Sequence, residues 1–160
     1  MITLELRTAR DNEQGAEAIS QFFLSLPNPP HEWWKPFDHA PSIFLEFFNQ
    51  GQTIYAFATV PEEMEPYIRS QIAACYPEVL VKTLEHDPLD ELRHPLPKKF
   101  GEVLLSGPSY LPLLTYKEMS SEVDSLAMVL SSLSRLASGE TALVQIQIRK
   151  VRENVKSQAY

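Results

Sequence analysis

The order in which strand-like and helix-like segments follow one another most constrains what this chain can fold into. Residues 2–7 alternate apolar and polar side chains, which is the two-residue period of a half-buried strand. Residues 11–26 predict a helix. The segment opens with the capping candidates Asp11 and Asn12, repeats apolar residues at helical spacing and ends before Pro27. A strand followed by a helix is therefore predicted. The apolar residues interpreted as lying at helical spacing are Ala16, Ile19, Phe22, Phe23 and Leu26.

The next segment predicts a hairpin and a second helix. Residues 42–60 read as two strands joined at 49–52, where Gly51 can adopt the positive φ that a tight turn requires. A helix is predicted to begin near Pro61 and to end before Pro77. Its predicted inward face comprises Met64, Ile68, Ile72 and Cys75. Residues 78–86 then predict a fourth strand, rich in Val and Leu.

The resulting order, strand-helix-strand-strand-helix-strand, predicts an α+β fold of the ferredoxin-like type over residues 1–88, with two helices on one face of an antiparallel sheet. Residues 89–101 are rich in proline and charge and are interpreted as a connection. Residues 102–150 predict an additional β-α-β segment packed on the first unit, whose strands could extend the first sheet or form a second one. Its helix is predicted to end at Gly139, and its inward face comprises Leu126, Val129, Leu130, Leu133 and Leu136. Residues 151–160 read as a polar, basic tail or the start of a linker.

Composition excludes several classes of function. The net charge of −7 disfavours broad binding to nucleic acid, because affinity for phosphates comes largely from Lys and Arg. A single cysteine, Cys75, rules out an internal disulfide framework. The sequence contains neither a long apolar run nor the apolar core of a signal peptide, so a soluble, cytoplasmic chain without a transmembrane segment is expected.

Motifs for catalysis or cofactor binding are weak. The five glycines are scattered singly, so neither a P-loop nor a dinucleotide fingerprint can be assembled, and no cofactor is predicted. His31 and His39 are weak metal candidates, because with Glu32 and Asp38 they lack the helical spacing that places two ligands on one face. Cys75 is interpreted as a small core residue rather than as a thiolate paired with His86. No catalytic residue is predicted.

Two segments are candidates for contact with a partner. The proline-rich stretch 27–41 carries Trp33, Trp34 and Phe37, which could pack on the core, stack on a ligand or contact another protein. A connection of this length is often functional, and its residue types suit contact better than catalysis. At the other end of the chain, the basic residues Arg149, Lys150 and Arg152 contrast with the acidic remainder and are further contact candidates.

Three stretches of the sequence resemble the region that precedes the motor domain in bacterial conjugation and type IV secretion ATPases. They are "GAEAISQFFLSL", "TIYAFATVPEEMEPYIRSQIAACYPEVLV" and "YLPLLTYKEMSSEVDSLAMVLSSLSRLASGETALVQIQIRKV". They cover most of the chain except residues 27–41 and 86–101. The resemblance implies a non-catalytic domain at the inner face of a membrane-associated motor, which contacts other subunits of the machine or copies of itself. The transmembrane segment and the ATPase that flank this region in those proteins are not in this sequence, which is expected to be a piece of a longer protein.

Two functions therefore remain open at the level of sequence. The first is an assembly or protein-interaction domain of a conjugation or secretion motor, in which edge strands and the loop that carries Trp33 and Trp34 contact neighbouring subunits. The alternative is a small enzymatic or ligand-binding domain with a pocket at Trp33 and Trp34. A weaker third possibility is binding of nucleic acid by exposed sheet aromatics such as Tyr55 and Phe57, which the acidic charge disfavours.

Overall fold

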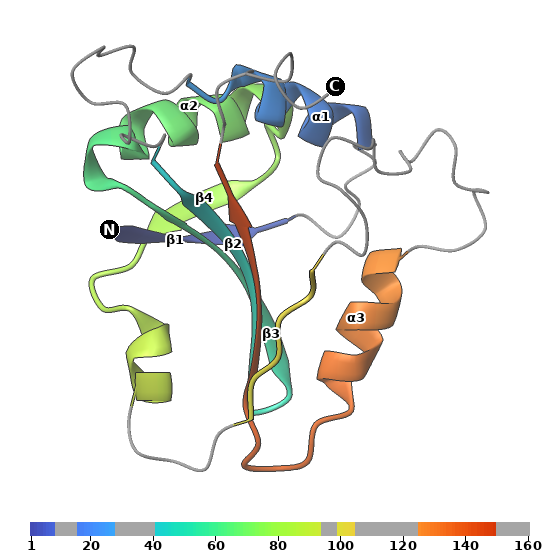
Figure 1. Ribbon diagram of the computed structural model, residues 1–160. Helices are drawn as coiled ribbons and strands as arrows, with labels where there is room; N and C mark the ends of the chain where they lie inside the picture. Colours follow the sequence, from blue (N-terminus) through green and yellow to red (C-terminus); the bar gives the residue numbers. More distant parts are fainter. Residues whose placement is uncertain (9–15, 28–40, 94–98, 105–124, 150–160) are drawn as a thin grey trace, which may run out of the picture.

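The computed structural model describes residues 1–8, 16–27, 41–93, 99–104 and 125–149 of the chain. In these residues it is an α+β structure with one five-stranded antiparallel sheet and three α-helices (Figure 1). The strands lie in the order β4-β1-β3-β2-β5. They are β1 (Ile2–Arg7), β2 (Ile43–Gln50), β3 (Thr53–Val60), β4 (Leu80–Thr83) and β5 (Ala142–Ile148). The helices are α1 (Ala16–Ser25), α2 (Glu65–Cys75) and α3 (Ser125–Ser134), with 3-10 turns η1 (Glu62–Met64) and η2 (Pro88–Arg93).

A hairpin joins β2 and β3 at the predicted turn, but the connection is shorter than predicted. Gly51 has φ +58° and Gln52 has φ +68°, so only these two residues form the connection, and Asn49 and Gln50 belong to β2. Two consecutive positive φ values are the mark of a turn whose twist matches that of the flanking strands. The β2–β3 register runs from Phe44 opposite Thr59 to Gln50 opposite Thr53.

One face of the sheet packs against α1 and α2, which lie side by side above it (Figure 1). The alternation of β1 is as predicted: Leu4 is fully buried and Ile2 and Leu6 are partly buried against the same core. From the helices, the buried contributors are Phe22, Leu26, Ile68 and Ile72, with Met64 from η1. Apolar burial between two helices and one sheet face is the principal stabilising contribution of this layer.

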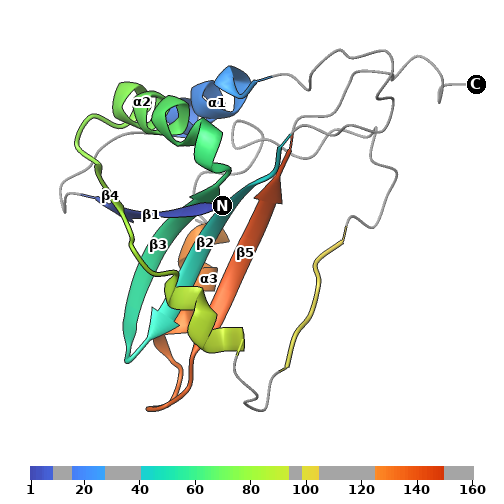
Figure 2. The same cartoon turned by 90° about the vertical axis from the view of Figure 1, so that its left-hand side faces the viewer.

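Helix α3 covers the hairpin end of the same face. Asn49 belongs to the alternating set of β2 side chains that includes Ile43, and its Nδ2 donates a hydrogen bond to the carbonyl of Leu133 at 3.1 Å. Leu133 is the buried residue of this helix, whereas Val129 and Leu130 are half-buried. Figures 1 and 2 place η2 on the other side of the strands from α3. The opposite face of the sheet therefore carries none of the three described helices.

The final strand decides between the two arrangements left open by the sequence. β5 pairs antiparallel with β2, from Ile43 opposite Ile148 to Asn49 opposite Ala142. It therefore extends the first sheet. Residues 99–104 have no regular secondary structure, and the remaining stretch predicted to contain short extended pieces lies outside the described residues, as do Asp11 and Asn12.

Several sequence predictions on the helices are wrong. Phe23 is 38% exposed because it follows Phe22 directly, and neighbouring residues on a helix point about 100° apart. Leu126, in the first turn of α3, is also exposed. α3 ends at Ser134, and Gly139, with φ +87°, lies in a later turn in which the N–H of Glu140 donates to the carbonyl of Ala137.

Residues 89–101 are interpreted from the sequence as a plain connection, but η2 (Pro88–Arg93) extends into them. The carboxylate of Asp87 accepts a hydrogen bond from the N–H of Leu89 at 2.9 Å, so the Asp-Pro pair starts the turn. The charge and proline content of this stretch concealed that capping signal.

Candidate functional site

The face of the sheet opposite α1 and α2 carries a continuous polar row across four strands. Its members alternate with the core residues along each strand, and they are joined by hydrogen bonds between side chains. In the order of the sheet from β1 to β5 they are Thr3, Thr59, Glu46 and Gln145. We refer to these four residues as the polar row.

Glu46 is the centre of the polar row. Its side chain is almost completely buried, at 2% exposed. One carboxylate oxygen, Oε1, accepts a hydrogen bond from Nε2 of Gln145 at 2.7 Å, and Oε2 accepts one from the hydroxyl of Thr59 at 2.8 Å. Because the Thr59 hydroxyl has one proton and donates it to Glu46, the hydroxyl of Thr3, 3.1 Å away, donates to Thr59. A carboxylate held in this way connects strands and is closed to substrate.

A charged pair extends the same face at the end of β1. Glu5 is buried, and its two oxygens accept hydrogen bonds from Nε and Nη2 of Arg7 at 2.7 and 3.1 Å. The hydrogen bond with Glu5, together with its negative charge, raises the pKa of Arg7. The guanidinium is mostly exposed, so this pair makes a small contribution to stability.

Aromatic residues fill the part of this face nearest the hairpin. The rings of Tyr55 and Phe57 stack with their centroids 6.0 Å apart, and Phe48 lies 6.3 Å from Phe57. Phe48 and Phe57 are buried and Tyr55 is half-buried. The expectation that Phe57 is exposed is therefore wrong, and this ring cannot serve as a platform for a nucleic-acid base.

The polar row makes a testable contribution to stability. We expect Glu46→Leu to lower the free energy of unfolding by about 2 kcal/mol, because it leaves the donors of Thr59 and Gln145 without their acceptor. Adding Thr59→Val removes one of these donors. The double variant should therefore lose about 1 kcal/mol less than the sum of the two single changes, as measured by urea unfolding. Strict additivity would contradict the hydrogen bond between Glu46 and Thr59.

The two edges of the sheet differ in how their strands are protected. β4 has only four residues, and Arg69 of α2 reaches it directly. The guanidinium donates to the carbonyl of Val81 at 2.7 Å and to the hydroxyl of Thr83 at 2.6 Å, and it also pairs with Glu65. Short length and an overlying charged side chain are features that prevent an edge strand from pairing with another chain.

β5, at the other edge, has neither form of protection. It is seven residues long, its sequence ALVQIQI contains no charge and no proline, and Ile146 is 46% exposed. In the described part of the chain, no strand pairs with the side of β5 that faces away from β2. Such an edge is a template for pairing with a further strand.

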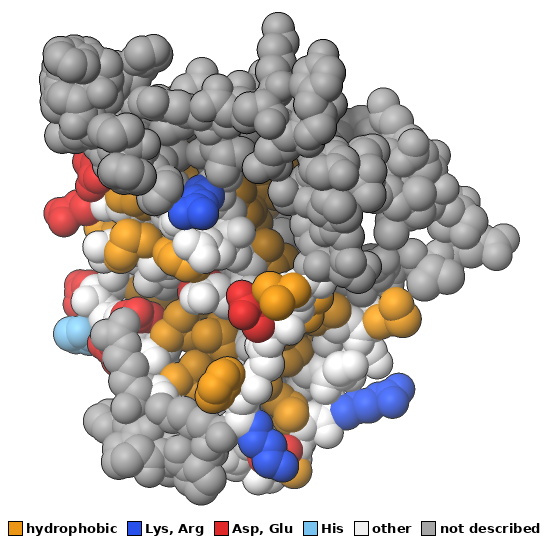
Figure 3. Space-filling model, in the orientation of Figure 1, with side chains coloured by type: hydrophobic (Ala, Val, Ile, Leu, Met, Phe, Trp, Pro, Cys, Tyr) orange, Lys and Arg blue, Asp and Glu red, His pale blue; other side chains and the backbone are white. Residues whose placement is uncertain are grey.

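An exposed apolar segment lies on the same side of the molecule. Residues 99–104 run beside β5 on the side away from β2 (Figure 2). Phe100 and Val103 are fully exposed and Leu104 is 73% exposed. Figure 3 views the molecule from this side and shows hydrophobic side chains at the surface with few charges between them. We refer to β5 together with residues 99–104 as the β5 side. An apolar surface of this kind is a feature of interaction sites.

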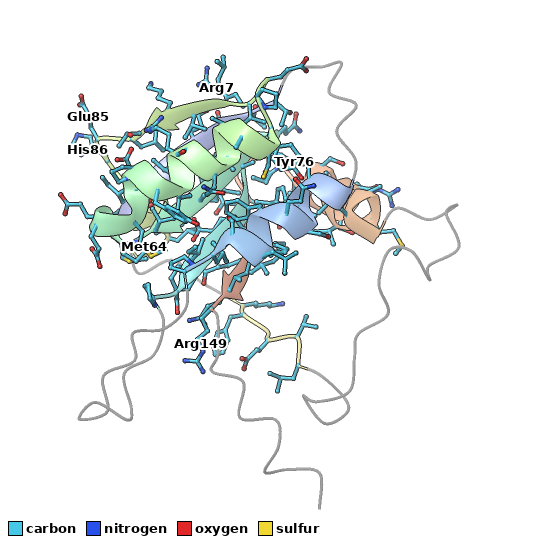
Figure 4. The ribbon with its side chains drawn as sticks, turned by 90° about the horizontal axis from the view of Figure 1, so that it is seen from above. Arg7, Met64, Tyr76, Glu85, His86 and Arg149 are labelled. Atoms are coloured by element: carbon cyan, nitrogen blue, oxygen red, sulfur yellow. The ribbon has the colours of Figure 1, made fainter. Side chains whose placement is uncertain are left out.

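Of the residues predicted from sequence to contact a partner, the structure describes only Arg149. It directly follows β5, is exposed and projects away from the helices (Figure 4). The other candidates lie outside the described residues: Trp33, Trp34, Phe37, Lys150, Arg152 and the weak metal candidates His31 and His39. The sequence predicted contact through edge strands in general but named no residue of the β5 side, because only the sheet order places β5 at an edge.

Cys75 and His86 do not form a pair. Cys75, the last residue of α2, is half-buried against the hydrophobic core, whereas His86 is exposed. Figure 4 places His86 at the opposite end of α2 from Tyr76, the residue after Cys75. Burial, with a smaller contribution from the neighbouring Cys75, raises the pKa of Tyr76. The interpretation of Cys75 as a core residue agrees with this position.

The described residues contain no cluster of three or more His, Cys, Asp or Glu side chains suited to a metal ion. Within the same ranges, no helix has both the length and the apolar content needed to cross a membrane. Comparison with protein-family models, with curated proteins and with solved structures finds no match for the chain. The resemblance to conjugation and secretion ATPases stays a prediction from the sequence.

Proposed function

We propose that this chain is a non-catalytic protein-interaction domain that contacts its partner through the β5 side. The observation that carries the proposal is the long, uncharged edge strand β5 beside the exposed side chains of Phe100, Val103 and Leu104. Backbone groups of an edge strand supply affinity, and nearby apolar side chains supply contact area and selectivity. Burial of Glu46, the central acid of the polar row, supports a structural role for that row.

We further propose a ferredoxin-like arrangement for the first four strands and two helices. The element order β1-α1-β2-β3-α2-β4 and the sheet order β4-β1-β3-β2 support it. β5 is then an addition at the β2 edge, and this addition creates the surface used for contact. A fold of this kind hosts many functions, so the proposed function is inferred from the β5 side and not from the fold.

The identity of the larger assembly is proposed from the sequence resemblance alone. The segments at 15–26, 53–81 and 110–151 favour a domain of a conjugative or type IV secretion motor, located at the inner face of the membrane. The partner is then another subunit of that machine or a second copy of this domain.

A capture experiment tests the proposed function. The full chain, immobilised, is incubated with each purified component of a conjugation machine, and the retained protein is measured. Replacing Phe100, Val103 and Leu104 together by serine should reduce retention by at least about tenfold, because burying each of these side chains contributes roughly 1–3 kcal/mol.

A matched control separates this effect from general loss of apolar surface. Leu24→Ser changes a residue of α1 that is 78% exposed and does not belong to the β5 side, and it should leave retention unchanged. Retention that is equal for the triple-serine variant and the unaltered chain would remove the β5 side from the proposal. Absence of retention for every component, including the domain itself, would reject an interaction function.

A further inference from the structure

β5 has a sequence that is complementary to itself. Two copies of one strand can pair antiparallel about a two-fold axis that is perpendicular to the sheet and passes between the two copies of one residue. Side chains on one face of the first strand then lie opposite side chains on the same face of the second. With the axis at Gln145, Val144 lies opposite Ile146 of a second copy, and Leu143 lies opposite Gln147 of that copy. The apolar members Val144 and Ile146 then continue the helix-covered face of one sheet into the other.

We propose that β5 pairs antiparallel with β5 of a second copy of this chain, forming one continuous sheet across a two-fold axis. This inference rests on the proposed function, because it names the partner for the contact surface on the β5 side. The exposed half of Ile146 is covered by Val144 of the other copy, and the free backbone edge gains a full set of hydrogen-bonding partners.

Charge also favours antiparallel pairing of the two copies. Placing the axis at Gln145 sets Arg149 opposite Thr141 of the other copy and one position from Glu140 of that copy. Both charged residues are exposed. The carboxylate of Glu140 is held at the start of β5 by a hydrogen bond from the N–H of Ala137 at 2.9 Å. Two symmetry-related pairs of opposite charge therefore flank the strand, although each chain carries a net charge of −7.

The expected interaction is weak enough to be reversible. Seven residues per strand give a small interface, and small interfaces belong to transient complexes. The proposal therefore concerns a monomer–dimer equilibrium that can be measured in solution.

Sedimentation equilibrium of the full 160-residue chain, from about 1 to 200 μM, is the first test. We expect a monomer–dimer equilibrium for the unaltered chain. Ile146→Lys should raise the dimer dissociation constant at least about tenfold, because it places like charges from both copies within the paired strands. Leu80→Lys makes the same kind of change at an exposed residue of the β4 edge and should leave the equilibrium unchanged. A monomer at all concentrations, or equal effects of the two lysine variants, would overturn the inference.

A charge-reversal pair tests the antiparallel pairing and avoids any change within β5 itself. Arg149→Glu alone should weaken the dimer, since it places like charges beside each other at both ends, and adding Glu140→Arg should restore the dissociation constant to within about threefold. Both positions are exposed, so thermal unfolding of these variants should match that of the unaltered chain. Failure of the second change to restore the dimer would contradict the proximity of Arg149 and Glu140 across the two-fold axis and would overturn the antiparallel pairing.

The outcomes also separate this inference from the proposed function. A chain that is strictly monomeric but captures a different protein through Phe100, Val103 and Leu104 contradicts β5 self-pairing and supports an interaction domain. A dimer that is lost in Ile146→Lys, from a chain that captures no other component, identifies the second copy as the partner.

Discussion

Replacing Ile68 by alanine is expected to lower the free energy of unfolding by about 4 kcal/mol. Ile68 is fully buried on the sheet-facing side of α2, where it belongs to the same cluster as Leu4 and Val60. The change removes buried methyl and methylene groups and leaves a cavity that the surrounding helices and sheet fill only partly. Urea unfolding followed by circular dichroism measures the difference.

A matched substitution on an exposed helical surface provides the control. Leu24→Ala removes a similar volume from α1, at a residue that is 78% exposed, and should change the free energy of unfolding by no more than about 0.5 kcal/mol. Equal losses for the two variants would show that Ile68 is not part of a close-packed core.

Phe48→Ala is expected to have an equally large effect on the other face of the sheet, about 4 kcal/mol. The ring is 1% exposed, and its centroid lies 6.3 Å from that of Phe57 with the two planes 34° apart. The substitution therefore removes both buried area and an aromatic contact. Thermal or urea unfolding gives the value, with near-ultraviolet circular dichroism reporting on the packing of the remaining aromatic rings.

Phe100→Ala is the matched control, since it makes the same chemical change at an almost entirely exposed ring. It should leave stability within about 0.5 kcal/mol of the unaltered chain. If Phe48→Ala were as mild as Phe100→Ala, the face that carries none of the described α-helices would contribute little to the stability of the sheet.

Most of the secondary structure follows from local pattern. The alternation in residues 2–7, the Gly51 turn and the helical spacing of Met64, Ile68 and Ile72 each predict an element that the structure contains. These signals are local because the period of a strand or helix is written in a few consecutive residues. The pairing of β5 with β2 depends instead on contacts between residues about a hundred positions apart, such as Glu46 with Gln145, and the sequence left two arrangements open.

The candidate surface was less predictable than the fold. Sequence directed attention to Trp33, Trp34 and the basic tail, because bulky aromatics and clustered charge are conspicuous. The β5 side could not be recognised until the sheet order placed β5 at an edge and showed that Ile146 is exposed. Likewise, Glu46 in an alternating strand reads as a solvent-facing acid, and only the positions of Thr59 and Gln145 explain its burial.

The position of β1 in the sheet has a consequence for how the chain folds during synthesis. β1 is made first, but it lies between β3 and β4, and its partners extend to Thr83. At roughly 5–20 residues per second, roughly 4–15 s pass between the synthesis of β1 and that of β4. β1 can pair with β3 before β4 is made, so closure of the sheet at the β4 edge depends on a distant pairing, and distant pairings slow folding.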